Sequence, residues 1–115
     1  MHIDAVRGGR IRDKIYRNVR VFVLRGKRVE LKNIALWGTG IIGKKYYSML
    51  QKLGKKPVMF VDNNIEKQGE FIDDIPIYAP DILKNTNDYT VLIACKANDD
   101  IYKQALELGI SEDKI

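Results

Sequence analysis

A chain of 115 residues, 45% hydrophobic and 30% charged, has the size and composition of one soluble globular domain and is too small for two. Its apolar runs are far shorter than the ~20 residues of a membrane-spanning helix, so we expect no transmembrane segment. The single cysteine excludes an internal disulfide and a cysteine-based metal cluster. Without a secretory signal pattern, we expect a cytoplasmic protein.

The positive charge is concentrated at the N-terminal end. The net charge is +5, yet residues 1–33 hold ten Lys or Arg against three Asp or Glu, whereas residues 34–115 hold ten against twelve. A basic segment of this kind can meet nucleic acid, anionic lipid or an acidic partner. Because no aromatic stacking platform accompanies the arginines, we do not expect nucleic-acid binding. The favoured interpretation is that these charges form the solvent-exposed face of a helix that packs in a larger assembly.

Residues 1–32 form a basic arm, for which the sequence favours a helix over residues 9–24. Apolar residues recur there at helical spacing: Ile11, Ile15, Val19 and Phe22. The alternative is a hairpin, because residues 19–24 are rich in β-forming side chains and Arg25-Gly26-Lys27 can turn the chain into residues 29–31. An apolar helical stripe flanked by arginines has to be buried against another surface. It therefore predicts a homodimer through residues 9–24, or packing against domains missing from this chain.

From residue 33 the pattern is typical of a βαβ unit. The apolar run 34–37 lacks polar alternation, as expected for a parallel strand covered on both faces. Apolar residues then recur at helical spacing over residues 42–53, and a second apolar run, 58–61, ends at Asp62. Strand, helix and strand together span some thirty residues, the size of a βαβ unit.

The C-terminal half continues the alternation. After a polar loop, 63–74, we expect residues 75–78 to form a strand that Pro76 confines to an edge or keeps very short. A short helix beginning at Pro80, a buried strand over residues 89–95 and a helix over residues 99–108 should follow.

Residues 33–115 are therefore predicted to form an α/β domain with a doubly wound parallel sheet, Rossmann-like but partial, with about four strands. Another strand is expected after Ile115, so we expect the chain to be a fragment truncated there.

Three glycines follow the first buried strand with the spacing G-x-G-x-x-G: Gly38, Gly40 and Gly43. In a dinucleotide-binding turn the first glycine permits the tight turn, the second lets a phosphate approach the backbone, and the third lets the helix pack closely on the sheet. Asp62 follows Gly38 by 24 positions, near the ~20 typical of the acid that binds a ribose. The alternatives are a tight turn that binds nothing, and a loop-capping role for Asp62.

The motif also discriminates among cofactors. Asp62 would repel a 2′-phosphate, so NAD is preferred over NADP. Sites for S-adenosylmethionine often have an acidic residue just before the first glycine. Trp37 occupies that position, which makes an S-adenosylmethionine-linked transferase fragment the less favoured alternative.

The stretches "WGTGIIGKKYY" and "FVDNNIEKQGEFIDDIPIYAPDIL" carry a resemblance to known families. They resemble the Rossmann-type N-terminal module of bacterial nucleotide-sugar dehydratases and epimerases of surface-polysaccharide assembly, and small domains joined to glycosyl-, acyl- and methyltransferases. The chain is also similar to the nucleotide-binding half of the glucose–fructose oxidoreductase family. The resemblance implies a domain that binds NAD or a nucleotide-sugar in an enzyme of sugar-nucleotide or surface-glycan metabolism.

Carried over by position, the resemblance implies a diphosphate loop at residues 38–43 and an adenosine-ribose acid at Asp62. The "ACKAN" loop, residues 94–98, stands where the oxidoreductase family contacts the nicotinamide ribose, although it departs from that family's usual Thr-Pro-Asn. The predicted cofactor site thus consists of Gly38, Thr39, Gly40, Ile41, Ile42, Gly43, Asp62, Asn63, Cys95 and Asn98.

We predict no catalytic residue in this chain. Cys95 has no histidine partner, since the only histidine is His2, and Asp73-Asp74 suits a solvated turn. The chain could belong to an NAD-dependent dehydratase, epimerase or oxidoreductase, or to a glycan-related transferase, with its chemistry located elsewhere. The alternative is a non-catalytic ligand-sensing or protein-interaction module.

Overall fold

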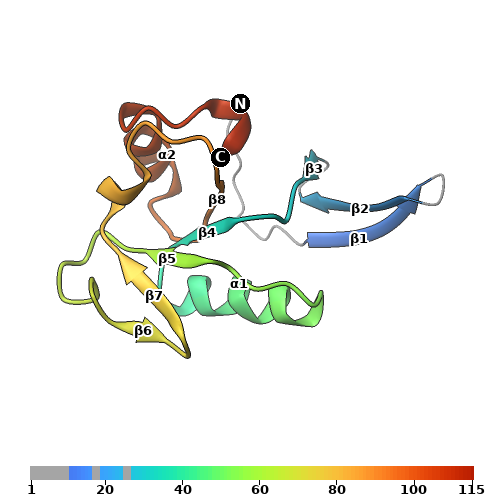
Figure 1. The fold of residues 1–115 in the computed structure, drawn as a ribbon, viewed down its shortest axis with the longest axis horizontal. Coiled ribbons are helices and arrows are strands. Elements are labelled where there is room, and N and C mark those ends of the chain that lie inside the picture. The colour runs from blue at the N-terminus through green and yellow to red at the C-terminus, as the bar shows by residue number, and fades with distance from the viewer. Residues whose placement is uncertain (1–10, 17–18, 25–26) are drawn as a thin grey trace.

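The computed structural model describes residues 11–16, 19–24 and 27–115 (Figure 1). The described part of the arm contributes three strands: β1 (Ile11–Tyr16), β2 (Val19–Leu24) and β3 (Lys27–Val29). The remainder alternates strands and helices: β4 (Ile34–Trp37), α1 (Ile41–Lys52), β5 (Met59–Val61), β6 (Phe71–Ile72), β7 (Ile75–Tyr78), the 3₁₀ helix η1 (Pro80–Leu83), β8 (Thr90–Ile93), α2 (Asn98–Glu107) and the 3₁₀ helix η2 (Glu112–Lys114).

The predicted helix over residues 9–24 is wrong, and the hairpin alternative describes the arm better. β1 pairs antiparallel with β2 from Ile11 opposite Leu24 to Tyr16 opposite Val19, and β2 pairs antiparallel with β3. Three of the six residues of β2 are valines, which lose rotamer freedom in a helix and favour a strand. Residues 9, 10, 17, 18, 25 and 26 of these predictions lie outside the described residues. The homodimer prediction depended on the helical stripe, so that argument no longer applies.

The predicted α/β class is confirmed, whereas the sheet, predicted to be parallel with about four strands, has five strands and is mostly parallel. The second sheet has the order β6-β7-β5-β4-β8, in which β7, β5, β4 and β8 run parallel and β6 is antiparallel to β7. The sequence missed β6, which lies in the loop predicted over residues 63–74. As a result β7 is not an outermost strand, but its four residues fit the other expectation for Pro76, a very short strand.

The two faces of this sheet are covered by different helices, because successive side chains of a strand point to opposite faces. Ile34 and Leu36 of β4 join the cluster that contains Tyr46 and Leu50 of α1. The alternate residues of β4, Ala35 and Trp37, point to the other face. They join the cluster formed with α2 and η1, whose members include Ile101, Ala105 and Leu83. Both faces of β4 are therefore buried, which explains why the strand contains no polar residue.

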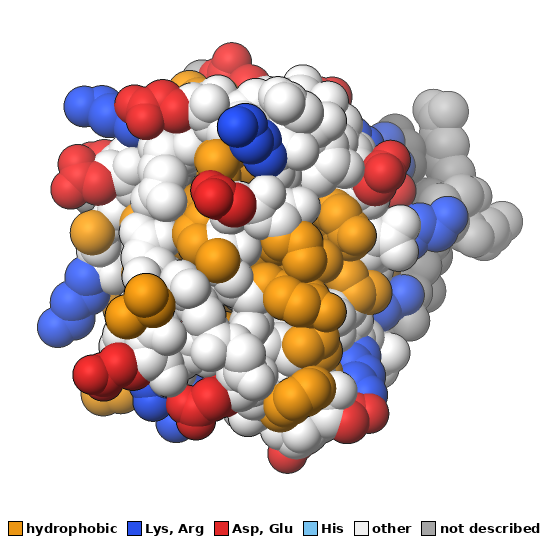
Figure 2. Space-filling model, turned by 60° about the vertical axis from the view of Figure 1, so that its left-hand side comes forward, with side chains coloured by type: hydrophobic (Ala, Val, Ile, Leu, Met, Phe, Trp, Pro, Cys, Tyr) orange, Lys and Arg blue, Asp and Glu red, His pale blue; other side chains and the backbone are white. Residues whose placement is uncertain are grey.

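The arm packs on the α1 side of the sheet. Ile11, Phe22 and Val29, one from each arm strand, lie in the same cluster as Leu36 and Leu50. The arm sheet extends to one side of the molecule, while the loops that follow β5 and β7 lie on the opposite side (Figure 1). Figure 2 brings that opposite side forward and shows hydrophobic side chains gathered on it. Among the described helices, none combines the length and apolar character needed to span a bilayer.

Candidate functional site

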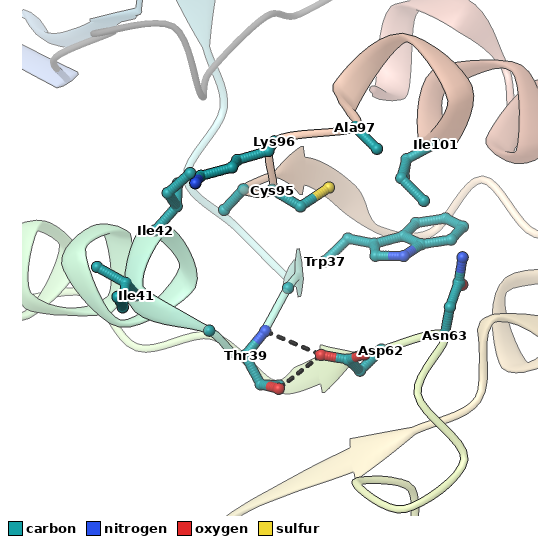
Figure 3. A pocket seen from close by; sticks show the side chains of 13 residues that line it. Trp37, Thr39, Ile41, Ile42, Asp62, Asn63, Cys95, Lys96, Ala97 and Ile101 are labelled. Atoms are coloured by element: carbon teal, nitrogen blue, oxygen red, sulfur yellow. Dashed lines mark hydrogen bonds between the residues drawn. The ribbon is translucent and has the colours of Figure 1, made fainter.

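Three segments that are distant in the sequence meet at the carboxyl edge of the parallel sheet. They are the glycine loop after β4, Asp62 and Asn63 after β5, and residues 94–97 after β8, which together with α2 enclose a cavity of about 350 Å³ (Figure 3). Eight of the ten predicted site residues line it: Gly38, Thr39, Gly40, Ile41, Ile42, Asp62, Asn63 and Cys95. The other two, Gly43 and Asn98, do not.

The three glycines of the loop differ in what surrounds them. Gly38 has a positive φ of 130°, and a Cβ there would overlap the carbonyl oxygen of Ala94. A Cβ on Gly43 would overlap the carbonyl oxygen of Gly38, so this glycine lets α1 lie close to the loop. Gly40 is different, because its φ is −81° and no atom lies within 4 Å of an added Cβ. The protein itself therefore requires glycine at positions 38 and 43 but not at 40.

The amino end of α1 faces this open space. Gly40 is the N-cap residue, no side chain caps the helix, and its first turn contains no acidic residue. The first amide N–H groups of a helix have no intrahelical partner and carry a partial positive charge. Ile41, the first helical residue, is 89% exposed at the cavity. The arrangement has the polarity and the access needed for an anion.

Asp62 links the glycine loop to the end of β5. Its Oδ2 accepts hydrogen bonds from the backbone N–H of Thr39 (3.1 Å) and from the Thr39 hydroxyl (2.5 Å). Its Oδ1 accepts a hydrogen bond from the backbone N–H of Asn64 at 2.8 Å. Both carboxylate oxygens are thus already engaged, and the loop-capping role foreseen for Asp62 is present. Its role toward a ribose stays a prediction.

The remaining predicted residues have structural surroundings of their own. Asn63 exchanges two amide hydrogen bonds with Gln104 of α2, at 2.9 and 3.2 Å. Burial, and secondarily the negative charge of Asp62, raises the pKa of the Cys95 thiol to about 11. Cys95 is therefore a protonated thiol at neutral pH and not a nucleophile. Asn98 is buried at the start of α2 and contributes no surface to the cavity.

The cavity also includes five residues that were not assigned to a site: Trp37, Ala94, Lys96, Ala97 and Ile101. Trp37 and Ile101 were expected only in the core, because apolar residues at a strand end and on a helix stripe give no sign of a ligand. Lys96 stands in the "ACKAN" loop, and its position directly after the carboxyl end of β8 was the signal that could have found it. The described residues contain no cluster of His, Cys, Asp or Glu suited to a metal.

Comparison with known proteins gives one assignment. Residues 30–115 match the family model described as C2185-like, N-terminal. The chain belongs to this C2185-like family. A search of curated proteins finds no match. The family match begins at the residue after β3 and contains the whole five-stranded sheet, both α-helices and every residue that lines the cavity. The family name specifies no ligand or reaction.

Proposed function

We propose that residues 33–115 form a Rossmann-like, doubly wound domain whose glycine loop binds the phosphate of NAD or of a nucleotide-sugar. The strand order supports this proposal. In open α/β sheets, ligands bind outside the carboxyl ends of the strands, at the point where the strand order reverses. Here the chain moves from β4 outward to β5 and β7 and then returns to place β8 on the other side of β4. The cavity lies at this reversal.

Gly40 is the observation that carries the proposal. A side chain at this position would meet no protein atom, and the backbone there is in a region that any residue adopts. A phosphate held against the amides at the start of α1 would occupy the same space. The packing of the protein does not explain why residue 40 is a glycine, whereas a bound phosphate would.

The wider role follows from the resemblance of "WGTGIIGKKYY" and the stretch after it to modules of bacterial sugar-nucleotide and surface-polysaccharide enzymes. We propose that this domain supplies the nucleotide site of such an enzyme and that the catalytic groups lie outside it. The description of the family as N-terminal is compatible with this division.

A second candidate is a ligand-sensing or interaction module without catalysis. The ionisable side chains lining the cavity are Asp62, Cys95 and Lys96. Asp62 is held by Thr39 and Asn64, and the Cys95 thiol keeps its proton until about pH 11. Within the described residues of the cavity, these groups do not make an acid–base pair, which favours binding over chemistry.

Thermal shift tests the proposal with a panel of NAD, NADP, S-adenosylmethionine and UDP-glucose. A ligand present at 100 times its dissociation constant adds about 2.7 kcal/mol to stability. We expect NAD or UDP-glucose to raise the melting temperature of the wild type and to have no effect on Gly40→Val, whose side chain occupies the phosphate position. Unchanged NAD or UDP-glucose binding by a folded Gly40→Val variant would show that the loop does not hold a phosphate.

A further inference from the structure

Lys96 places a positive charge near the amino end of α1. Its side chain extends from the loop after β8 toward Ile42, in the first turn of the helix (Figure 3). Among the described residues, no acidic side chain pairs with the Lys96 amine, and Asp62 is engaged by Thr39 and Asn64. Lys96 is exposed, and an anion between its ammonium group and the positive end of the helix dipole would be attracted to both. The positive charge of Lys96 and the amino end of α1 therefore favour the binding of an anion in this part of the cavity.

Trp37 leaves a hydrogen-bond donor unused at another wall of the same cavity. The side chain is 1% exposed, and its indole Nε1 has no hydrogen-bond partner among the described residues. A buried N–H without a partner is costly and is uncommon in folded proteins. The indole lies between Ile101 and Asn63, with its nitrogen on the edge that faces Asp62 and Asn63 (Figure 3).

We infer that the cavity binds a ligand with two chemically different parts. Its anionic group lies between the amino end of α1 and Lys96. Its uncharged part lies beside Asn63, at the nitrogen-bearing edge of Trp37, and accepts a hydrogen bond from Nε1 of Trp37. This inference rests on the proposed function and names the two residues that select the ligand: Lys96 for the phosphate and Trp37 for the attached sugar or nucleoside.

Access to the indole nitrogen requires a small rearrangement. Asn63 lies beside the ring and is exposed, and within the described part of the chain its amide pairs with that of Gln104. Amide groups at the surface exchange such bonds for water with little net cost. Opening the pair uncovers the nitrogen for an oxygen or nitrogen atom of the ligand. Inorganic phosphate or pyrophosphate has no uncharged part and leaves Trp37 unpaired.

Calorimetric titration with pyrophosphate, NAD and UDP-glucose tests the two residues separately. For Lys96→Met we expect at least tenfold weaker binding of every phosphate ligand that the wild type binds, because a charge-assisted bond is lost. Lys96→Arg should restore it. For Trp37→Phe, which keeps an apolar ring, we expect about tenfold weaker binding of NAD or UDP-glucose and unchanged binding of pyrophosphate. Lys84→Met, an exposed charge outside the cavity, is the matched control.

A second measurement keeps the role of Trp37 testable if Trp37→Phe is poorly folded. Trp37 is the only tryptophan, so the wild type has one indole N–H resonance. NAD or UDP-glucose should shift it strongly downfield, and pyrophosphate should not. Wild-type binding that is unaffected by Lys96→Met, or an indole resonance that nucleotides do not move, overturns the two-part ligand and leaves the proposed function standing. Failure of every phosphate ligand to bind the wild type overturns both.

Discussion

At the scale of single residues, the glycine loop shows that one motif can contain glycines with different purposes. Gly38 and Gly43 prevent overlap with backbone carbonyl oxygens, which cannot move aside as the end of a flexible side chain can. Gly40 prevents no overlap within the protein. The motif therefore separates into two positions that serve the fold and one that we assign to the ligand.

This separation predicts opposite outcomes for two alanine substitutions. Gly43→Ala should destabilise the protein by about 1–3 kcal/mol, because the new methyl group overlaps Gly38 and forces α1 away from the loop. Gly40→Ala should cost less than about 1 kcal/mol, the scale of a poorer N-cap residue. Urea denaturation of both variants measures the difference. Equal losses of stability in the two variants would mean that the close contact of Gly43 with Gly38 does not require glycine.

Thr39 and Asp62 allow the role of the carboxylate to be divided. Asp62→Ala should weaken NAD binding by about 1.5–3 kcal/mol, the range for hydrogen bonds to a charged group. Thr39→Val removes only the hydroxyl bond to Asp62 and keeps the backbone bond. If Asp62 binds the ribose directly, Thr39→Val should leave NAD affinity nearly unchanged, as titration calorimetry would show. Equal weakening by the two variants would instead indicate that Asp62 acts only by shaping the loop.

Cys95 should react slowly with alkylating reagents despite its place at the cavity. Burial and the charge of Asp62 raise its pKa to about 11, and the thiolate is the reactive form. At pH 8 it should therefore contain roughly a hundredfold less thiolate than an ordinary exposed thiol. Its rate with iodoacetamide should keep rising with pH until about pH 11. A rate that levels off below pH 9 would contradict this environment.

At the scale of elements, α1 is tied to the turn between β6 and β7. The Tyr47 hydroxyl donates a 2.6 Å hydrogen bond to Asp73, and the Tyr47 ring meets Phe60 of β5 edge-on at 5.4 Å. Beside it, Lys56 pairs with Asp74 at 2.7 Å, but both side chains are exposed, so this pair contributes little. Tyr47 is therefore the principal polar link between the helix and this edge of the sheet.

The Tyr47 link predicts a loss of stability at high pH. Its hydrogen bond to Asp73, followed by burial, raises the pKa of Tyr47 from 10.0 to about 12. The folded state thus holds the phenolic proton more tightly than the unfolded state. The resulting stabilisation is complete below pH 10 and is lost as the pH rises towards 12. Tyr47→Phe should cost about 1 kcal/mol at pH 7 and reduce the loss between pH 10 and 12.

Denaturation at several pH values measures this effect. Tyr78→Phe, at an exposed tyrosine, is the matched control and should behave as the wild type. If stability falls equally in Tyr47→Phe and the wild type between pH 10 and 12, the loss is due to other ionisable groups.

At the scale of the whole molecule, the arm and the five-stranded sheet share one hydrophobic cluster. Phe22 of β2 is 9% exposed and belongs to the cluster that contains Leu36, Tyr46 and Leu50. The ammonium group of Lys55 also lies 5.4 Å from the centre of its ring. The arm strands therefore cover part of the α1 face, and their removal would expose apolar surface.

Truncation of Phe22 should destabilise the whole chain. We expect Phe22→Ala to cost about 3 kcal/mol, because it leaves a cavity between the arm and α1. Phe71→Ala removes the same atoms from a side chain that is 64% exposed and should cost much less. Denaturation followed by Trp37 fluorescence reports on the sheet rather than on the arm. If Phe22→Ala leaves that transition unchanged, the arm does not stabilise the sheet.

The residues alone were sufficient to predict β4, α1, β5, β7, η1, β8 and α2. In each of these segments the hydrophobic period agrees with the tertiary environment, as in β4, where four apolar residues in a row match a strand buried on both faces. The glycine spacing likewise located the edge of the sheet that holds the cavity, because the carboxyl ends of parallel strands lie together.

Tertiary structure decided what local pattern left ambiguous. The arm has apolar residues at helical spacing, but the pairing of β1 with β2 and β2 with β3, and the burial of Phe22 on the α1 face, favour strands. Strand β6 is formed by pairing with β7 and by packing of Ile72 on the core, neither of which its two-residue sequence reveals. Trp37 ends β4 and Lys96 lies in the loop after β8, so two strands that are adjacent in space bring together residues more than fifty positions apart in the chain. Sequence determines local periodicity, whereas burial and long-range pairing depend on which segments the fold brings together.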